Sequence, residues 1–388
     1  MKITKIEAII LESPRGYGVH GSEASGPKYR SLLRVATDAG IDGWAEIETQ
    51  PHALKAVIEA PGDGTGFFDG IGSLAVGEDP FEMERLWTRL FNHTMYYGRR
   101  GVVLQAISGI DIACYDIMGK ALGKPIHALL GGARRRQVPA YASTLFRDTP
   151  QAMKEAAQQY VDRGFTAVKF GWGGFGRDRQ KDAALVQAAR ETLGKDRVLM
   201  VDAGWIYPRS VPETIAMIRA IEPFDPFWVE EPCHPEDYAA YKAVADATAI
   251  RIAAGEQEGT VWGFEHLIRE GGVDVVQPDL SRCGGFTVAR QVVALAEAAG
   301  RSICPHAWQS DLLTAASLHF NAILPDVEAG LKPAPTAFQE YNVCDDPISR
   351  SLCRTPLRCV DGVLTVPEGP GLGVEVDEEA VARFRVDK

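Results

Sequence analysis

Asp202, Glu230 and Glu256 each end a short apolar segment of the chain, and their spacing suits a shared site. The separations, 28 residues from 202 to 230 and 26 from 230 to 256, each fit one strand, loop and helix. In a parallel β/α array, carboxylates at successive strand ends converge on one face, where their oxygens suit a hard cation such as Mg²⁺. Each acid alone could instead cap a helix or pair with an arginine, but three in consecutive units favour a metal site. Because strand side chains alternate, we expect Glu230 to point inward and the adjacent Glu231 to lie behind it.

An aspartate and a histidine follow at the next two strand ends. Asp279 ends the segment Gln277-Pro278-Asp279, and His306, 27 residues later, ends Cys304-Pro305-His306. A carboxylate beside an imidazole fixes its tautomer and raises its basicity. A lone histidine at a strand end is more often structural, but the neighbouring aspartate and metal acids favour a general base.

Two further charged residues end predicted strands of the same array. Lys169 lies in the apolar segment 167–171, and an inward lysine is unfavourable unless it meets an anion. Its partner would be a substrate carboxylate or enolate, or alternatively one of the metal-binding acids. Glu340, at the eighth strand end, could donate or order a hydrogen bond where negative charge develops.

The segment Gly171-Trp172-Gly173-Gly174-Phe175-Gly176 matches the G-x-G-x-x-G pattern of dinucleotide-binding proteins. The next strand to end in an acid does so at Asp202, 31 residues after Gly171, rather than about 20 beyond the motif. The glycines therefore indicate a flexible lip over the barrel mouth more than a phosphate site.

Composition and charge exclude several classes of protein. The composition, 46% hydrophobic and 24% charged, is that of a soluble globular protein. The length of 388 residues predicts two lobes. A formal net charge of -11 argues against a nucleic-acid partner. No stretch reaches the apolar length that spans a bilayer, and residues 1–10 alternate like a strand rather than a signal peptide. Seven scattered cysteines without a C-x-x-C pair indicate reduced thiols, so we expect a cytoplasmic protein with no membrane partner.

The order of the predicted elements favours a barrel with a capping unit. Residues 2–12 and 30–48 are predicted strands, and 101–122 a helix. From residue 137, apolar runs recur near positions 140, 168, 200, 228, 253, 276, 303 and 338, with helical segments between them. Eight such runs suit a (β/α) barrel better than an open sheet. We expect an α+β domain at 1–125, the barrel at 126–345, and a C-terminal segment at 346–388 that packs on the first domain.

These motifs together resemble the enolase superfamily, in the mandelate racemase/muconate lactonizing enzyme family and its mandelate racemase branch. The resemblance covers nearly the whole chain. It is carried by GIDIACYD at 109–116, GKPIHALLGG at 123–132, Val201-Asp202-Ala203, Val229-Glu230-Glu231-Pro232, Gly255-Glu256, Gln277-Pro278-Asp279, Pro305-His306 and GPGLG at 369–373.

The resemblance implies an α/β fold, a (β/α)7β modified TIM barrel with an α+β capping domain formed from both chain ends. It also implies that Asp202, Glu230 and Glu256 bind Mg²⁺, that the substrate is a small-molecule carboxylate chelated by the metal, and that its α-proton is removed to give a stabilised enolate. A homo-oligomer is a further implication.

One departure from the family pattern bears on the reaction. Members with a base on the second strand usually carry Lys-x-Lys, whereas here the second lysine position is Gly171. Residues i and i+2 share a strand face, so racemisation by two opposed bases is hard to build. A dehydratase needs fewer groups, because His306 can take the α-proton and then protonate the departing β-hydroxyl. We therefore expect a hydro-lyase that converts a sugar acid, an aldonate or aldarate, to a 2-keto-3-deoxy acid, and segments 305–307 and 338–341 are similar to acid-sugar dehydratases.

Arg15, His20 and Lys28 are candidate contacts for the distal end of the substrate, although all three could equally be solvated surface residues. The alternative enzyme is a racemase or epimerase of a 2-hydroxy acid, with Lys169 as the opposing base. A nicotinamide-dependent oxidoreductase has only the glycine motif in its favour. A catalytically silent binding or structural protein would leave the acids, His306 and Lys169 without purpose.

Overall fold

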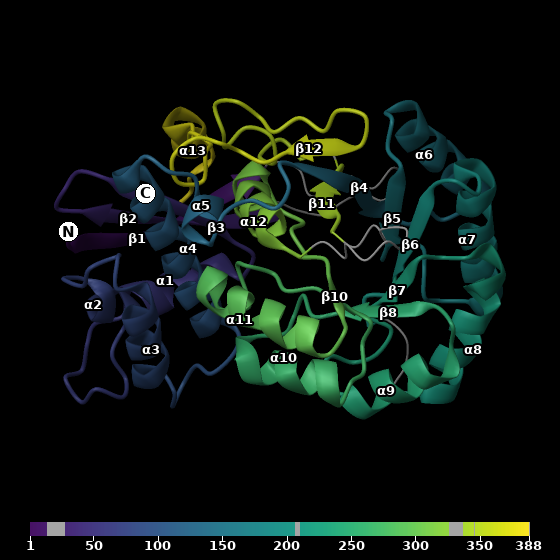
Figure 1. The fold of residues 1–388 in the computed structure, drawn as a ribbon, viewed down its shortest axis with the longest axis horizontal. Helices are drawn as coiled ribbons and strands as arrows, with labels where there is room; N and C mark the ends of the chain where they lie inside the picture. The colour runs from purple at the N-terminus through teal and green to yellow at the C-terminus, as the bar shows by residue number, and fades with distance from the viewer. Residues whose placement is uncertain (14–27, 206–209, 326–336, 345, 388) are drawn as a thin grey trace.

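The chain forms an antiparallel sheet with its helices at one end and a β/α barrel at the other (Figure 1). The computed structural model describes residues 1–13, 28–205, 210–325, 337–344 and 346–387. In the first part, β1 (Ile3–Ser13), β2 (Lys28–Thr37) and β3 (Asp42–Ile47) pair in sequence order. The helices that follow are α1 (Pro51–Glu59), α2 (Ile71–Ala75), α3 (Met83–His93), α4 (Val102–Leu122) and α5 (Ile126–Leu129).

Helix α4 is the core helix of the first part. It packs on β3 so closely that a Cβ on Gly109 would lie 2.3 Å from the Ile47 side chain. It ends at Gly123, whose left-handed φ of 62° suits a helix C-terminus. The helix is also long and apolar enough to cross a membrane, so the expectation that no stretch reaches that length was wrong. Since 83% of its apolar window is buried inside the protein, the protein core covers it.

The second part alternates eight parallel strands with seven helices in the described ranges. Its strands pair in the order β10-β9-β8-β7-β6-β5-β4-β11. Side-chain caps start several of the helices, as Thr149 does for α6 and Asp178 for α7. The elements are β4 (Gln137–Leu145), α6 (Pro150–Asp162), β5 (Ala167–Gly171), α7 (Arg179–Leu193), β6 (Val198–Asp202), α8 (Val211–Ile221), β7 (Trp228–Glu230), α9 (Tyr238–Ala247), β8 (Arg251–Ala254), α10 (Thr260–Arg269), β9 (Val275–Val276), α11 (Gly285–Ala298), β10 (Ser302–Ile303), α12 (Asp311–Ile323) and β11 (Gln339–Asn342).

The strands close around a filled interior. One buried side chain from each strand or its edge joins a single cluster, separate from the larger core under the helices. Its members are Tyr141, Ala167, Met200, Trp228, Ala253, Val275, Cys304 and Phe338. Side chains that meet in a layer across all the strands are the mark of a packed barrel. The predicted (β/α)7β barrel with an α+β cap is confirmed.

The C-terminal segment touches both parts. Strand β12 (Val363–Thr365) pairs antiparallel with β4, and α13 (Glu378–Phe384) contacts β1. Figure 1 shows this segment, in yellow, along the upper edge of the molecule. The domain boundaries expected at 125 and 345 stay a prediction.

Candidate active site

A cavity of about 560 Å³ lies where the carboxyl ends of the barrel strands face the cap. The barrel contributes Lys169, Asp202, Glu256, His306 and Glu340 to its lining, and the cap contributes Glu48, Arg100 and Gln105. Active sites of such barrels occupy this end because loops there vary without disturbing the strands. Most of the predicted barrel residues therefore line one cavity.

The predicted metal ligands form a buried cluster of carboxylates. Asp202 and Glu230 are register partners at the ends of β6 and β7, and Glu256 follows β8 by two residues. Burial raises the pKa of Asp202 well above its ordinary value, and the charge of Glu230 adds to this. Burial likewise raises the pKa of Glu231, with repulsion from Glu256 next in size. Buried like charges of this kind require a cation or protons.

Lys169 forms ion pairs within this cluster. Its Nζ lies 2.6 Å from Glu230 Oε1, 2.9 Å from Glu340 Oε1 and 3.8 Å from Asp202 Oδ2. Burial alone would lower the pKa of Lys169, but these carboxylates raise it well above its ordinary value. The sequence left two kinds of partner open for Lys169: a substrate anion or the metal-binding acids. The structure contains ion pairs between Lys169 and these acids.

His306 and Asp279 form the expected pair. His306 Nδ1 lies 2.7 Å from Asp279 Oδ2, and Ser281 donates to Asp279 Oδ1 from its backbone N–H and its hydroxyl. Although burial opposes it, hydrogen bonding to His306 and the charge of Arg282 lower the pKa of Asp279. An ionised aspartate accepts, so Nδ1 donates and Nε2 carries the free lone pair when the ring is neutral.

The acids around Nε2 favour a protonated ring. Burial alone would lower the pKa of His306, but Glu256, 3.4 Å from Nε2, and Glu340, 3.7 Å away, raise it well above its ordinary value. Glu256 makes the larger contribution of the two. A cation held by Glu256 would remove that contribution and favour the neutral ring that a general base needs.

Glu340 lies between Lys169 and His306. Its Oε1 accepts from Ser143 Oγ at 2.7 Å, and its Oε2 accepts from the backbone N–H of Ala307 at 2.8 Å. Burial would raise its pKa, but Lys169 and His306 together lower the pKa of Glu340 to about 2. An ionised carboxylate accepts hydrogen bonds but donates none. Of the two roles predicted for Glu340, its environment therefore favours ordering the neighbouring groups over donating a hydrogen bond.

Arg282 and Glu48 are site residues that the sequence reasoning missed. Arg282 Nη2 lies 3.0 Å from Glu48 Oε2 in the cap, and Nη1 lies 3.3 Å from Glu256 Oε1. The backbone N–H of Glu48 donates to Ser281 Oγ at 3.2 Å, which places the end of β3 beside the histidine pair. Arg282 follows Asp279 by three residues, so its position close to a strand end could have identified it as a site residue. No local sequence pattern around Glu48 indicates that it reaches the site.

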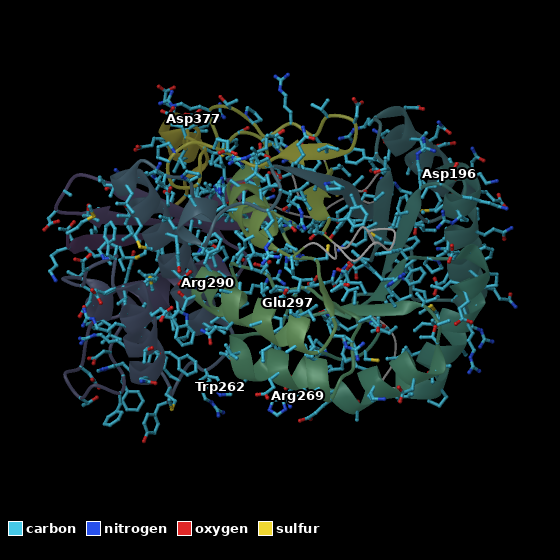
Figure 2. The ribbon with its side chains drawn as sticks, in the orientation of Figure 1. Asp196, Trp262, Arg269, Arg290, Glu297 and Asp377 are labelled. Carbon is cyan, nitrogen blue, oxygen red and sulfur yellow. The ribbon has the colours of Figure 1, made fainter. Side chains whose placement is uncertain are left out.

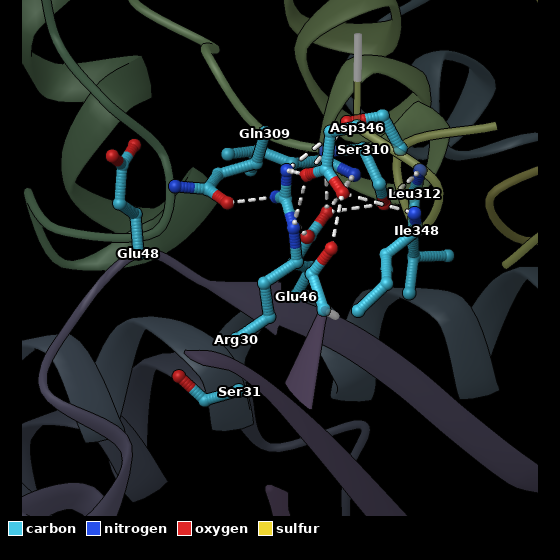
Figure 3. A network of polar contacts seen from close by, with 12 residues as sticks. Arg30, Ser31, Glu46, Glu48, Gln309, Ser310, Leu312, Asp346 and Ile348 are labelled. Atoms are coloured by element: carbon cyan, nitrogen blue, oxygen red, sulfur yellow. Dashed lines mark hydrogen bonds and ion pairs between the residues drawn. The ribbon is translucent and has the colours of Figure 1, made fainter. Parts of the chain in front are cut away.

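A second buried network joins the cap to the barrel beside the cavity (Figure 3). Arg30 on β2 pairs with Glu46 on β3 at 3.1 Å and with Asp346, and it also donates to Gln309. Glu46 in turn accepts from the backbone N–H of Ser310 at 3.0 Å. Figure 3 shows Arg30 enclosed by residues of both parts. The network fixes β2 and β3 against the loop that follows His306.

The predicted contacts for the distal end of the substrate are only partly visible. Lys28 lies with Nζ 5.2 Å from the ring centre of Trp308, which lines the cavity. Burial, and then the charge of Arg30, lower the pKa of Lys28 to about 8. Arg15 and His20 lie outside the described residues.

The glycine motif begins at the end of β5 and precedes α7. Gly171 ends β5 and lines the cavity, whereas Gly173, with φ of 61°, packs so that a Cβ would lie 2.3 Å from the carbonyl oxygen of Phe146. This close contact with the backbone explains why residue 173 is a glycine, and no bound phosphate is needed to explain it.

Two groups of side chains are candidates to hold a metal. Ligand atoms of Glu48, Asp279 and His306 lie within 4.8 Å of one another. Asp279 already accepts from His306 and Glu48 faces Arg282, so internal ion pairs satisfy that group. Asp202, Glu230 and Glu256 offer oxygens only, the ligand type that suits a hard divalent cation. Lys169 pairs with Asp202 and Glu230, and Arg282 and His306 pair with Glu256.

Fold and cavity define the class: a (β/α)7β barrel enzyme whose acidic site is closed by a cap. Two family models match the chain, the enolase C-terminal domain-like model over residues 152–380 and the mandelate racemase/muconate lactonizing enzyme N-terminal domain model over residues 23–131. The chain belongs to the mandelate racemase/muconate lactonizing enzyme family of the enolase superfamily. The predictions of this family and of an enzyme are confirmed.

The comparisons also identify individual relatives. The chain is 35% identical over 361 residues to the D-galactarolactone cycloisomerase of Agrobacterium fabrum, covering 92% of this chain and 91% of that protein. It is 34% identical over 371 residues to the D-galactonate dehydratase of Xanthomonas euvesicatoria pv. vesicatoria, covering 91% and 90%. The crystal structure of the 3,6-anhydro-D-galactonate cycloisomerase from Zobellia galactanivorans has a TM-score of 0.86 and 29% identity over the whole of both chains.

Proposed function

We propose that the protein is a Mg²⁺-dependent dehydratase of a sugar acid, an aldonate or aldarate. The observation that carries the proposal is the pair of His306 and Asp279, 2.7 Å apart, with His306 lining the cavity beside Glu256 of the acid cluster. The D-galactonate dehydratase among its relatives supports the same class of reaction. Asp202, Glu230 and Glu256 would hold the cation, which stabilises negative charge on the oxygens of a substrate carboxylate when bound.

His306 carries both proton transfers. Its Nε2 takes the α-proton of the substrate while Asp279 accepts from Nδ1–H and stabilises the imidazolium. The imidazolium then gives a proton to the β-hydroxyl as the C3–O bond breaks, so that water leaves and an enol remains. The enol tautomerises to the 2-keto-3-deoxy acid. Although burial opposes it, hydrogen bonding to His306, followed by the charge of Arg282, lowers the pKa of Asp279 and so favours its ionised form.

A two-base racemase has less support from the geometry. Lys169 is the candidate opposing base, yet Glu230 and Glu340 both lie within 2.9 Å of its Nζ. Those contacts hold the ammonium form, which cannot accept a proton. Gly171, the next inward position, has no side chain to replace it.

The test is a panel of aldonates and aldarates incubated with Mg²⁺, with semicarbazide to detect 2-keto acids. We expect one or a few substrates to give keto acid, and His306→Asn to reduce turnover by at least 10³-fold, since it removes the base. Normal turnover by His306→Asn would refute the assignment of the base. Exchange of the C2 proton in deuterated water without elimination, across the whole panel, would favour a racemase instead.

A cycloisomerase is a second candidate, because relatives of that kind occur in both comparisons. If the leaving oxygen belongs to a ring of the substrate, the same two proton transfers open the ring and no water is released. Product mass separates the two reactions: a dehydratase product is lighter than its substrate by one water, and a cycloisomerase product has the mass of its substrate.

A further inference from the structure

A buried hydrogen bond connects the packed interior of the barrel to the acid cluster. Trp228 and Glu230 lie two residues apart on β7, so their side chains point to the same face of the strand. The indole Nε1–H of Trp228 donates to Glu230 Oε2 at 3.0 Å, and Lys169 Nζ lies 2.6 Å from Glu230 Oε1. Both Trp228 and Glu230 are buried. Each oxygen of this proposed metal ligand therefore has a donor of its own.

Packing fixes the position of the indole that makes this bond. Trp228 belongs to the layer of side chains that fills the barrel. Its ring meets that of Tyr141 edge to face, with the ring centres 5.8 Å apart, and the Tyr141 ring centre lies 5.4 Å from Lys169 Nζ. The aromatic layer thus contacts both partners of the ion pair between Lys169 and Glu230. Because a close-packed interior leaves an indole few other positions, the direction of its N–H is set by the barrel core.

The acceptor of this indole is unusual for a buried tryptophan. A buried indole needs an acceptor for its N–H, and a neutral carbonyl oxygen is sufficient. Trp87 has such an acceptor, because its Nε1 donates to the backbone carbonyl oxygen of Gly284, also at 3.0 Å. Trp228 instead donates to a carboxylate, and within the described chain it is the one donor to Glu230 Oε2. Without this N–H, the oxygen would be buried with no partner there, and the carboxylate could turn about its terminal bond.

We propose that Trp228 is a positioning residue of the metal site, whose N–H holds the carboxylate of Glu230 in the orientation that binds the cation. This inference rests on the proposed function, because it requires Glu230 to be a metal ligand. Asp202 and Glu230 are register partners on neighbouring strands, so a turn of one carboxylate changes how the pair can share an ion. Groups that hold a metal ligand in place commonly contribute about 10- to 100-fold to metal affinity.

The experiment is isothermal titration calorimetry with MgCl₂ on the full chain. The test variant is Trp228→Phe, and the matched control is Trp87→Phe, since each loses an indole N–H that makes a 3.0 Å hydrogen bond. We expect Trp228→Phe to bind Mg²⁺ about 10- to 100-fold more weakly than wild type, and Trp87→Phe to stay within about two-fold of it. Thermal unfolding of the metal-free proteins measures separately what each substitution costs in stability.

A second measurement follows the hydrogen bond itself. Indole N–H groups give separate resonances in the ¹H–¹⁵N spectrum of labelled protein, and the resonance that Trp228→Phe removes belongs to Trp228. We expect this resonance to shift as Mg²⁺ is added, because its acceptor is then shared with the cation. Trp262 serves as the reference, because it is 59% exposed and lies at the lower edge of the molecule, away from the barrel interior (Figure 2).

The outcomes separate this inference from the proposed function. If Trp228→Phe does not fold, 3-benzothienylalanine is inserted at position 228, since its sulfur removes the N–H and keeps the shape of the indole. Wild-type affinity for Mg²⁺ in a folded variant without this N–H would overturn the role of Trp228 and leave the metal site intact. Equal weakening by Trp87→Phe, or a Trp228 resonance unmoved at saturating Mg²⁺, would overturn it as well. A wild-type chain that binds no Mg²⁺ would refute the metal site itself.

Discussion

Gly171 controls the space around Asp202, the first of the proposed metal ligands. Gly171 and Asp202 are register partners in β5 and β6, and a Cβ on Gly171 would lie 2.7 Å from Asp202 Oδ2 and 2.9 Å from its Cγ. Real Cβ atoms essentially never come so close, so a side chain at 171 must displace Asp202. The missing second lysine and the position of Asp202, a proposed metal ligand, are therefore linked.

We predict that Gly171→Ala weakens Mg²⁺ binding by about 10- to 100-fold, the usual effect of disturbing a ligand's support. Isothermal titration calorimetry with MgCl₂ measures the effect directly. The backbone at 171 is not left-handed, so the variant should still fold, and the unfolding temperatures of both metal-free proteins are the control. Unchanged affinity for Mg²⁺ would contradict the prediction, because Asp202 would then accommodate the added methyl group.

Sequence reasoning found the site residues that the barrel itself supplies. Lys169, Asp202 and His306 each end an apolar run, and parallel strands bring such ends together. Glu48 and Arg100 were missed because they reach the cavity only through the packing of the cap, which no local pattern records. Their roles, like those of the predicted ligands and base, stay predictions.

At the scale of elements, the buried pairs of Arg30 hold two strands of the cap on the barrel. Arg30, Glu46 and Asp346 are all nearly inaccessible to solvent. Removing one partner of such a pair leaves uncompensated buried charge, whereas an exposed pair contributes little. Arg34, four residues along the same strand, pairs with Asp42 at a partly exposed position and provides the comparison.

We predict that Arg30→Ala lowers the free energy of unfolding by about 3 to 5 kcal/mol, and Arg34→Ala by less than about 1 kcal/mol. Urea titration followed by circular dichroism measures both. Equal losses in the two variants would contradict a special role for the buried pairs.

The elements themselves were largely predictable. Hydrophobic runs at regular spacing gave the eight barrel strands, and the helix expected at 101–122 is α4 at Val102–Leu122. The membrane test on α4 shows the limit of such patterns. A helix buried in a protein core and one buried in lipid are apolar alike, and only the tertiary structure distinguishes them.

At the scale of the whole molecule, His319 connects three separate regions. It lies on α12, its Nε2 donates to the carbonyl oxygen of Leu372 at 3.0 Å, and its Nδ1 lies 3.4 Å from the backbone N–H of His127 on α5. Only the neutral ring can donate at one nitrogen and accept at the other. Burial lowers the pKa of His319 to about 4.

This environment predicts a loss of stability in mild acid. The folded-state pKa of about 4 lies below the ordinary 6.5, so the unfolded chain binds the proton more readily between these values. The contribution is complete above pH 6.5 and is lost as the pH falls toward 4, by about 3 kcal/mol. His319→Gln keeps a donor and an acceptor but cannot titrate. Unfolding free energies from pH 7 to 4 should therefore fall less steeply in this variant, and equal slopes would contradict the prediction.

The filled barrel interior has a consequence for the order of events in a catalytic cycle. Tyr141, Trp228 and Phe338 close the barrel beneath the acids, so nothing passes through the barrel to the far end. Substrate would therefore enter, and product leave, by the opening on the cap side, where Glu48 and Arg100 of the described chain line the cavity. A substitution at that opening can therefore slow product escape as much as it alters substrate choice, and pre-steady-state bursts would reveal which of the two limits turnover.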